Sequence, residues 1–217
     1  MLNIQTQPRT QQTDNSFRNP LGLMSDCHRR IEMFFARLIE VAETDRGHQL
    51  TDSRRETLET ALRYFSAGAP LHTEDEEVSL FPRLRAVGGP FAEAALKALE
   101  ELESDHRAAE AAHNEIDSLG MRWLEEGTLP QWDADRLVNL AKDLRELYRG
   151  HIDIEDNHVF PLAKEALGAD VIEQVGREMA SRRGLDYDNI PLANRCAQRR
   201  LRRELAPGDN IAAGAGS

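Results

Sequence analysis

Two segments of the sequence carry the same pattern of side chains that can bind a metal ion. Segments 71–84 (LHTEDEEVSLFPRL) and 150–163 (GHIDIEDNHVFPLA) each place a Glu four positions after a His, and a Phe-Pro pair nine and ten positions after it. On an α-helix, residues four positions apart lie one turn apart on the same face. Each segment therefore predicts an imidazole and a carboxylate that point the same way, an arrangement suited to metal ligation.

A further His precedes each segment at almost the same distance. His28 lies 44 positions before His72, and His106 lies 45 positions before His151. This self-similarity indicates two related halves, each of which supplies one lone His and one His-Glu pair. The candidate ligands are six residues: His28, His72, Glu76, His106, His151 and Glu155.

Six such groups that converge inside a protein are suited to a pair of metal ions. Neutral imidazoles are strong nitrogen donors, and two carboxylates can bridge two cations and cancel part of their charge. Without metal, two buried carboxylates would be strongly destabilising or would have to be protonated. Nitrogen and carboxylate donors without a thiolate favour iron, then manganese, and disfavour a structural zinc site, which usually recruits Cys.

The elements that position these residues are predicted to be helices. Apolar residues recur at spacings of three and four, and no long alternating run indicates a strand. The pattern predicts four long helices and a shorter fifth: residues 20–46, 53–85, 90–126, 133–167 and 170–183. We therefore expect an all-α protein, an up-down-up-down four-helix bundle with a short fifth helix and a C-terminal tail.

Local signals mark the ends and bends of these helices. Ser53 and Glu56 have the spacing of a capping box at the start of the second helix. Pro70 is expected to kink that helix. The Phe-Pro pairs at 81–82 and 160–161 are expected to end helices and to anchor them in the core.

Composition and charge exclude other classes of protein. The chain has 217 residues, of which 40 % are hydrophobic, and 27 Lys and Arg against 38 Asp and Glu give a formal net charge of −11. An acidic body repels phosphate backbones, and no stretch approaches the roughly 20 apolar residues of a membrane span. Cys27 and Cys196 are too few for a disulfide framework. We expect a cytoplasmic protein that binds neither nucleic acid nor membranes, and we make no prediction of its oligomeric state.

Three regions are expected along the chain. Residues 1–18 are polar and predict a flexible N-terminal segment, residues 19–183 predict the bundle, and residues 184–217 predict an Arg-rich C-terminal extension with a flexible tail. We interpret the arginines of the extension as a solvated helix face, with a basic contact patch as the alternative.

The order His, HxxxE, His, HxxxE resembles that of the hemerythrin-like, or HHE cation-binding, domains over roughly residues 19–168. The resemblance implies a four-helix bundle that holds two iron ions bridged by an oxo or hydroxo group, with manganese the less favoured metal. It further implies that both glutamates bridge the two irons. One iron would take His28 and His72, and the other would take His106 and His151.

The chain departs from the oxygen-carrying hemerythrins, which have five histidines. Glu110 stands where the fifth would be, so reversible oxygen carriage is not implied. Glu110 is either a further ligand or an ordinary partner of Arg107 or Arg122.

Tyr148 precedes His151 by one turn, so its phenol either faces the metal pocket and hydrogen-bonds a bound ligand or reaches the surface from the core. The pattern is closer to the four-histidine, two-glutamate proteins of the family, which include proteins that repair iron centres.

Four residues near the candidate ligands need separate interpretations. Glu77 and Asp156, each next to a candidate bridging glutamate, either orient an imidazole or are helix-surface charges. His113 and His158 lie two turns after a candidate ligand, and we expect both to be hydrogen-bonded core histidines.

The ligand set predicts a binding protein: a di-iron site that binds oxygen, nitric oxide or peroxide and serves as sensor, scavenger or iron reservoir. The alternative is a di-iron redox enzyme that decomposes peroxide or repairs iron-sulfur centres, using open coordination positions. Whether the chain is an enzyme stays open at this point. A metal-free helical interaction protein is disfavoured by the repeated ligands.

Overall fold

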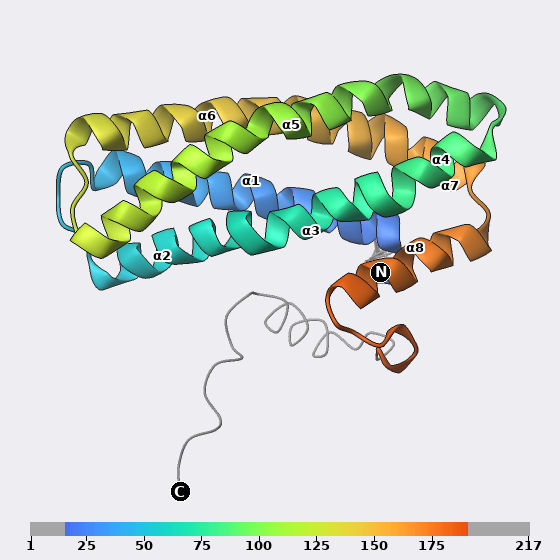
Figure 1. The fold of residues 1–217 in the computed structure, drawn as a ribbon, viewed down its shortest axis with the longest axis horizontal. Helices are drawn as coiled ribbons and strands as arrows, with labels where there is room; N and C mark the ends of the chain where they lie inside the picture. Colours follow the sequence, from blue (N-terminus) through green and yellow to red (C-terminus); the bar gives the residue numbers. More distant parts are fainter. Residues whose placement is uncertain (1–15, 191–217) are drawn as a thin grey trace, which may run out of the picture.

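The computed structural model describes residues 16–190 (Figure 1), and the residues it describes contain helices but no strand. The prediction of an all-α bundle is confirmed. The α-helices are α1 (Pro20–Thr44), α2 (Asp52–Arg63), α3 (Ala69–Glu74), α4 (Phe81–Val87), α5 (Gly89–Glu126), α6 (Gln131–Ile154), α7 (Phe160–Ala166) and α8 (Ala169–Arg182). The described residues also contain three π-helical turns, η1 (Tyr64–Gly68), η2 (Asp75–Leu80) and η3 (Glu155–Val159), and a 3₁₀ turn, η4 (Tyr187–Asn189).

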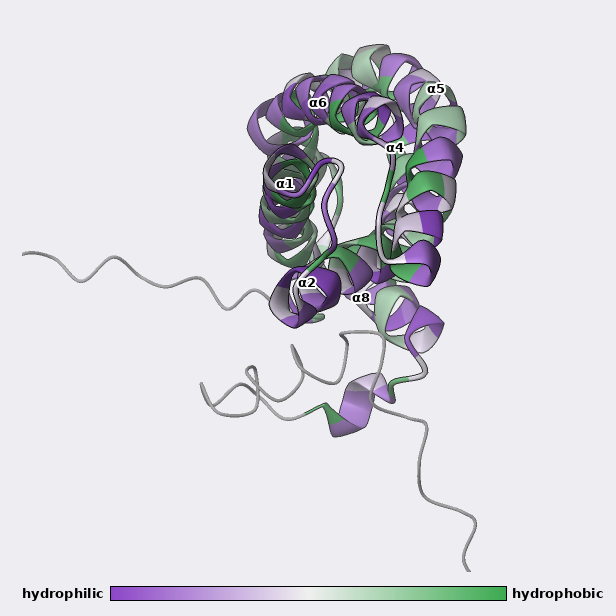
Figure 2. Ribbon diagram, turned by 90° about the vertical axis from the view of Figure 1, so that its left-hand side faces the viewer, coloured by the Kyte–Doolittle hydropathy of each residue, from purple (hydrophilic) through white to green (hydrophobic). Residues whose placement is uncertain are grey.

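Four long rods form the bundle. They are α1, the continuous path from α2 through α3 to α4, α5, and the path from α6 to α7 (Figure 1). α1 packs against α2 and α6, and α5 packs against the same two, so the rods form a square in which neighbours in sequence are neighbours in space. Figure 2, which looks along the bundle, shows mainly hydrophilic outer faces and hydrophobic residues turned inward. No helix among residues 16–190 is long and apolar enough to cross a bilayer.

The helix ends follow from local chemistry. The side chain of Asn19 accepts a hydrogen bond from the backbone N–H of Gly22, and Pro20 occupies the first turn of α1. Thr51 caps α2 by accepting from the N–H of Arg54, so the predicted cap at Ser53 is wrong by two residues. Gly127 ends α5 in the left-handed conformation with φ 77°, and α5 stops at Glu126, the end that the sequence predicted.

The Phe-Pro pairs do not end helices, which corrects the prediction. Each proline lies two residues beyond the end of a π-helical turn, and the helix continues past it as α4 or α7. A proline lacks an N–H and its ring clashes with the carbonyl four residues earlier in an α-helix. The preceding turn widens instead, so that the N–H of Phe81 reaches the carbonyl of Glu76 and that of Phe160 reaches Glu155. Pro70 follows η1 in the same way.

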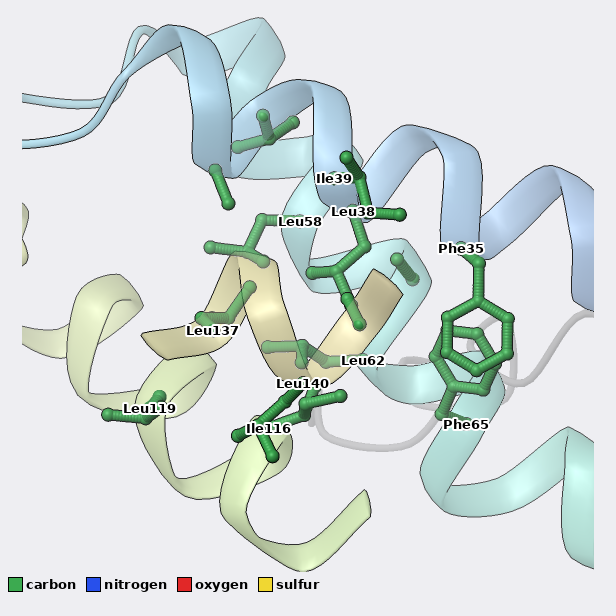
Figure 3. Close-up of a cluster of buried hydrophobic side chains, with 14 of the residues drawn as sticks. Phe35, Leu38, Ile39, Leu58, Leu62, Phe65, Ile116, Leu119, Leu137 and Leu140 are labelled. Atoms are coloured by element: carbon green, nitrogen blue, oxygen red, sulfur yellow. The ribbon is translucent and has the colours of Figure 1, made fainter. Parts of the chain in front are cut away.

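Two hydrophobic clusters fill the bundle, one towards each end. The first joins α1, α2, α5 and α6, and its close packing includes Phe35 against Phe65 (Figure 3). The second joins the first turns of α1 to α4, α5, α7 and α8. On α1 the second cluster reaches Met24 and the first begins at Ile31. His28 lies between them, so the six candidate ligands form a polar layer between two apolar ones.

Helix α8 lies outside the square of four rods (Figure 1). Gly176 allows a close approach to the N-terminal segment, because a Cβ there would lie 1.9 Å from the carbonyl oxygen of Phe17. Phe17 is 1 % exposed and packs in the second cluster. Phe17, which the sequence assigned to the N-terminal segment, therefore fills an apolar site beside α8. The Arg-rich stretch after residue 190, with Cys196, lies outside the described residues.

Candidate metal centre

The structure brings the six candidate ligands together in the middle of the bundle. Each rod contributes: α1 and α5 supply one His each, and the His-Glu pairs come from α3 with η2 and from α6 with η3. The donor atoms fall into two groups, and within each group all of them lie within 4.8 Å of one another. The first group comprises His28, His72, Glu76 and Glu155, and the second comprises Glu76, His106 and His151. Glu76 belongs to both groups. Both carboxylates are 0 % exposed, so this polar layer is shielded from solvent.

The distances show that each carboxylate faces histidines of both groups. Glu76 Oε1 lies 3.1 Å from His72 Nε2, and Glu76 Oε2 lies 3.8 Å from His106 Nε2. Glu155 Oε2 lies 3.1 Å from His28 Nε2, and Glu155 Oε1 lies 3.3 Å from His151 Nε2. One oxygen of each carboxylate is thus turned to each histidine pair, which is the orientation that a bridging ligand requires.

Most of the candidate donor atoms have no hydrogen-bond partner, which tests whether they fit a metal. Among the described residues, both oxygens of Glu76 and of Glu155, and the Nε2 atoms of His28 and His151, are buried without a hydrogen-bond partner, although they lie close together. Buried polar atoms are normally satisfied, and buried charges are paired or coordinate metals. Two cations placed among these atoms would supply the missing partners, so the residues fit the metal pair that the sequence predicted.

Carboxylates hold three of the imidazoles from behind. The Nδ1 atom of His28 lies 3.1 Å from Asp156 Oδ1, and that of His106 lies 2.8 Å from Glu77 Oε1. Of the two readings of Glu77 and Asp156, the structure supports the orienting one. Such contacts fix the ring and the tautomer, leaving the other nitrogen free for a metal.

Asp105 supplies a third orienting carboxylate, which the sequence did not indicate. Asp105 Oδ2 lies 3.4 Å from His151 Nδ1. Asp105 precedes His106 in sequence, yet it serves a histidine on another helix, and no spacing along the chain signals that contact. His72 differs from the others, because its Nδ1 atom is buried without a hydrogen-bond partner among the described residues.

The protein environment separates the proton affinities of the two glutamates. Burial, together with the negative charge of Glu155, raises the pKa of Glu76 to about 8. Burial would also raise the pKa of Glu155, but the imidazoles of His151 and His28 lower it below its ordinary value. The metal-free centre therefore holds a proton on Glu76 at neutral pH, which a bound cation would replace.

Tyr148 lies beside the centre and is held by His113. The Tyr148 hydroxyl lies 3.1 Å from His113 Nε2, and its ring centroid is 6.0 Å from that of His151. Burial lowers the pKa of His113 to about 4, so this imidazole is neutral. Its Nδ1 atom is buried without a partner. Because a buried N–H without an acceptor costs more than a bare lone pair, the favoured tautomer donates from Nε2 to Tyr148 and leaves the phenol hydrogen free.

Two other predicted residues lie outside the ligand groups. Glu110 is exposed on α5 and is not part of either donor group. His158 is exposed, so its predicted place in the core is wrong. The π-helical turn η3 adds a residue to the helix between His151 and His158, which turns His158 outward and places Val159 in the core.

A small cavity adjoins the donor atoms. Its volume is about 10 Å³, room for a single small molecule, and the four histidines and Glu155 line it together with apolar side chains and Tyr148. The apolar part of the lining is formed by Ile31, Ala69 and Ile152.

Comparison with known proteins agrees with this geometry. Residues 19–163 match the family model of the Hemerythrin HHE cation binding domain. An uncharacterized protein of Haemophilus influenzae is 28 % identical over 168 residues, which cover 77 % of this chain and 92 % of the relative. No solved structure gives a significant match. Because the family match spans more than half of the chain and contains all six candidate ligands, the chain belongs to the hemerythrin HHE cation-binding domain family.

Proposed function

We propose that this protein is a non-haem di-iron protein whose buried centre binds a small ligand, namely oxygen, nitric oxide or peroxide, as a sensor, scavenger or iron reservoir. One observation carries the proposal: two buried groups of histidine and carboxylate donors share Glu76 and adjoin a cavity of about 10 Å³. Membership of a cation-binding family supports the metal, and the geometry supports a pair of metals.

The donor chemistry favours iron. Four imidazoles and two carboxylates, without a thiolate among the grouped donors, suit iron or manganese better than a closed zinc site. His28 and His72 would hold one ion, His106 and His151 would hold the other, and Glu76 and Glu155 would serve both. When bound, iron supplies open coordination positions and reversible one-electron chemistry.

The chain's own residues set which molecules can reach and stay at the centre. The cavity is too small for an organic substrate, and Ile31, Ala69 and Ile152 make part of its wall apolar. Tyr148 lines the same cavity, and His113 leaves its phenol hydrogen free to donate to a bound ligand. A diatomic molecule or peroxide fits these restrictions.

An enzymatic role, such as peroxide decomposition, is the second candidate. The observation in its favour is also Tyr148, because a phenol that can donate a hydrogen bond to a peroxide can also stabilise the charge that develops as the O–O bond breaks. The binding function requires only that Tyr148 hold the ligand.

One set of measurements separates the two candidates. Iron-loaded, anaerobically reduced protein is exposed to nitric oxide and, separately, to oxygen, and the absorption spectrum is followed before and after the gas is removed. A binding protein shows a spectral change on adding nitric oxide that reverses on removal. Oxygen evolution that continues over many equivalents of added hydrogen peroxide would instead establish the enzyme.

The control is His151→Ala, which removes one ligand of the second group. It is expected to lose at least one metal ion per chain and the response to nitric oxide. A His151→Ala protein that keeps its full metal content and its spectrum would contradict the proposed ligand set.

A further inference from the structure

A cleft on the bundle surface leads to the centre from one side. It lies between the η1–α3 segment and α5 and has a volume of about 530 Å³. The cleft and the small inner cavity share four lining residues: Ala69, Thr73, His106 and Tyr148. A thin wall of these side chains therefore separates solvent from the donor atoms.

Acidic side chains outnumber basic ones in the wall of the cleft. Glu74, Glu77, Glu110 and Asp117 line it, against the guanidinium of Arg107, and Arg182 lies 3.6 Å from Glu74. His113 also lines it but is neutral, because burial lowers its pKa to about 4. A concave surface with an excess of one charge concentrates ions of the opposite sign.

Two acidic residues and two histidines form one row on α5, and the innermost of the four is a candidate metal ligand. Asp117, His113, Glu110 and His106 lie at helical spacings of four, three and four residues and all line the cleft. At the inner end, Glu77 contacts the Nδ1 atom of His106. A cation that moves inward along the cleft meets the carboxylates of Asp117, Glu110 and Glu77 in turn.

A second observation indicates that the species that moves through the cleft is a cation. At the inner end of the route, the small cavity is lined by Glu155, which is 0 % exposed and whose two carboxylate oxygens have no hydrogen-bond partner among residues 16–190. Buried, unpartnered carboxylate oxygens bind a divalent cation strongly, whereas an anion would be repelled. The acidic cleft therefore leads towards a buried carboxylate that can accept a cation.

We propose that the cleft between η1–α3 and α5 is the route by which divalent metal ions load the centre, and that Glu110 is a transfer ligand on this route. This inference rests on the proposed function, because it requires that cations occupy the centre. It gives Glu110 a role that its exposed position permits: contact with the incoming ion, without a place in the final ligand set.

The test measures the rate of metal loading. Metal-free protein is mixed with Co²⁺ at low ionic strength in a stopped-flow instrument, and the visible absorption of bound Co²⁺ is followed to completion. Glu110→Gln and Asp117→Asn each remove a negative charge from the cleft, and both are expected to slow loading about three- to fivefold, with the final stoichiometry unchanged.

Two further variants fix the sign and the location of the effect. Arg107→Gln removes the opposing charge from the same cleft and is expected to accelerate loading by a similar factor. Glu125→Gln is the matched control, because Glu125 is exposed on the same helix but does not line the cleft. It should load at the rate of the unmodified chain. All differences should shrink as salt shortens the screening length to about 10 Å at 0.1 M.

A steric variant tests the route itself. Ala69→Leu fills the wall shared by the cleft and the inner cavity, and it is expected to slow loading at every salt concentration. Equal loading rates in all the variants, with full final Co²⁺ content, would overturn the proposed route while leaving the metal centre intact. Failure of the unmodified chain to bind Co²⁺ at all would instead overturn the metal centre, and the route with it.

Discussion

At the scale of single residues, the two donor groups, each a proposed metal position, are not equivalent. Both histidines of the second group are held by carboxylates, His106 by Glu77 and His151 by Asp105. In the first group, only His28 is held in this way, because the Nδ1 atom of His72 has no hydrogen-bond partner among the described residues. A carboxylate behind an imidazole raises its basicity and fixes its orientation. We expect the first position to bind its ion more weakly.

Removing the one carboxylate behind the first position should weaken it selectively. Asp156→Ala is expected to reduce the affinity of one of the two bound ions by about 10- to 100-fold. Asp156→Asn, whose amide oxygen can still accept from His28, should lose less. The measurement is a Co²⁺ titration of metal-free protein. Asp143→Asn, an exposed change on α6, is the control, and equal affinities in all three variants would refute the orienting role.

Tyr148 should matter for ligand binding and not for metal binding. Tyr148→Phe removes a hydrogen-bond donor worth about 1 kcal/mol, so the affinity of the oxidised, iron-loaded protein for azide should fall roughly five- to tenfold. Azide is titrated against the visible absorption spectrum. Tyr64→Phe is the control, because the Tyr64 hydroxyl bonds the carbonyl of Cys27 and does not line the cavity. Unchanged azide affinity would show that the phenol faces elsewhere.

Glu76 should make the metal-free protein sensitive to alkali. Its pKa is raised from the ordinary value near 4.5 to about 8 in the folded chain. The folded state therefore holds the proton more tightly than the unfolded state, and the stability from this group is complete below pH 4.5 and is lost as the pH rises to about 8. Glu76→Gln, which cannot ionise, should remove this loss.

Chemical unfolding of the metal-free proteins between pH 5 and pH 9 checks this expectation. The stability of the original chain relative to Glu76→Gln should fall across that range and level off above about pH 8. The same substitution should reduce metal binding in the intact protein. Parallel pH profiles for the two proteins would show that Glu76 does not titrate in this range.

At the scale of the elements, the π-helical turns place the glutamates. η2 and η3 begin at or beside the two glutamates that are proposed to bridge the metals, and each ends directly before the Phe-Pro pair that the sequence repeats. The repeat was visible in the sequence, but its consequence was misread, because a proline usually ends or kinks a helix. Here, the proline keeps a widened turn open, and that turn shifts the register of everything beyond it, as the exposure of His158 shows.

Replacing one of these prolines should allow the turn to close. Pro82→Ala restores an N–H and removes the ring, so a regular α-helix becomes accessible and Glu76 would rotate out of line with the other ligands. We expect weaker Co²⁺ binding with thermal stability of the metal-free chain unchanged or raised. Pro90→Ala, in the first turn of α5 where a missing N–H is harmless, is the control. Undiminished metal affinity in Pro82→Ala would show that the proline does not maintain the turn.

At the scale of the whole molecule, the sequence predicted the features that arise from repeated motifs and from periodic apolar residues. The spacing of apolar residues predicted the long helices, and the duplicated HxxxE pattern predicted the six residues that converge. Contacts between helices left no such trace: Asp105 behind His151, Phe17 against Gly176, and the cleft beside α5 each depend on how the rods pack. Cap positions such as Thr51 were also missed, because two neighbouring residues can both serve as caps.

The proposed function and the proposed loading route both require a pair of cations where the four rods meet. The most direct test is elemental analysis of the purified chain, beside Glu155→Ala prepared in the same way. The account predicts about two iron ions per unmodified chain and a clear loss of iron in the variant, with the helical content of both retained. A purified chain that holds no transition metal, even after incubation with ferrous iron, would contradict it.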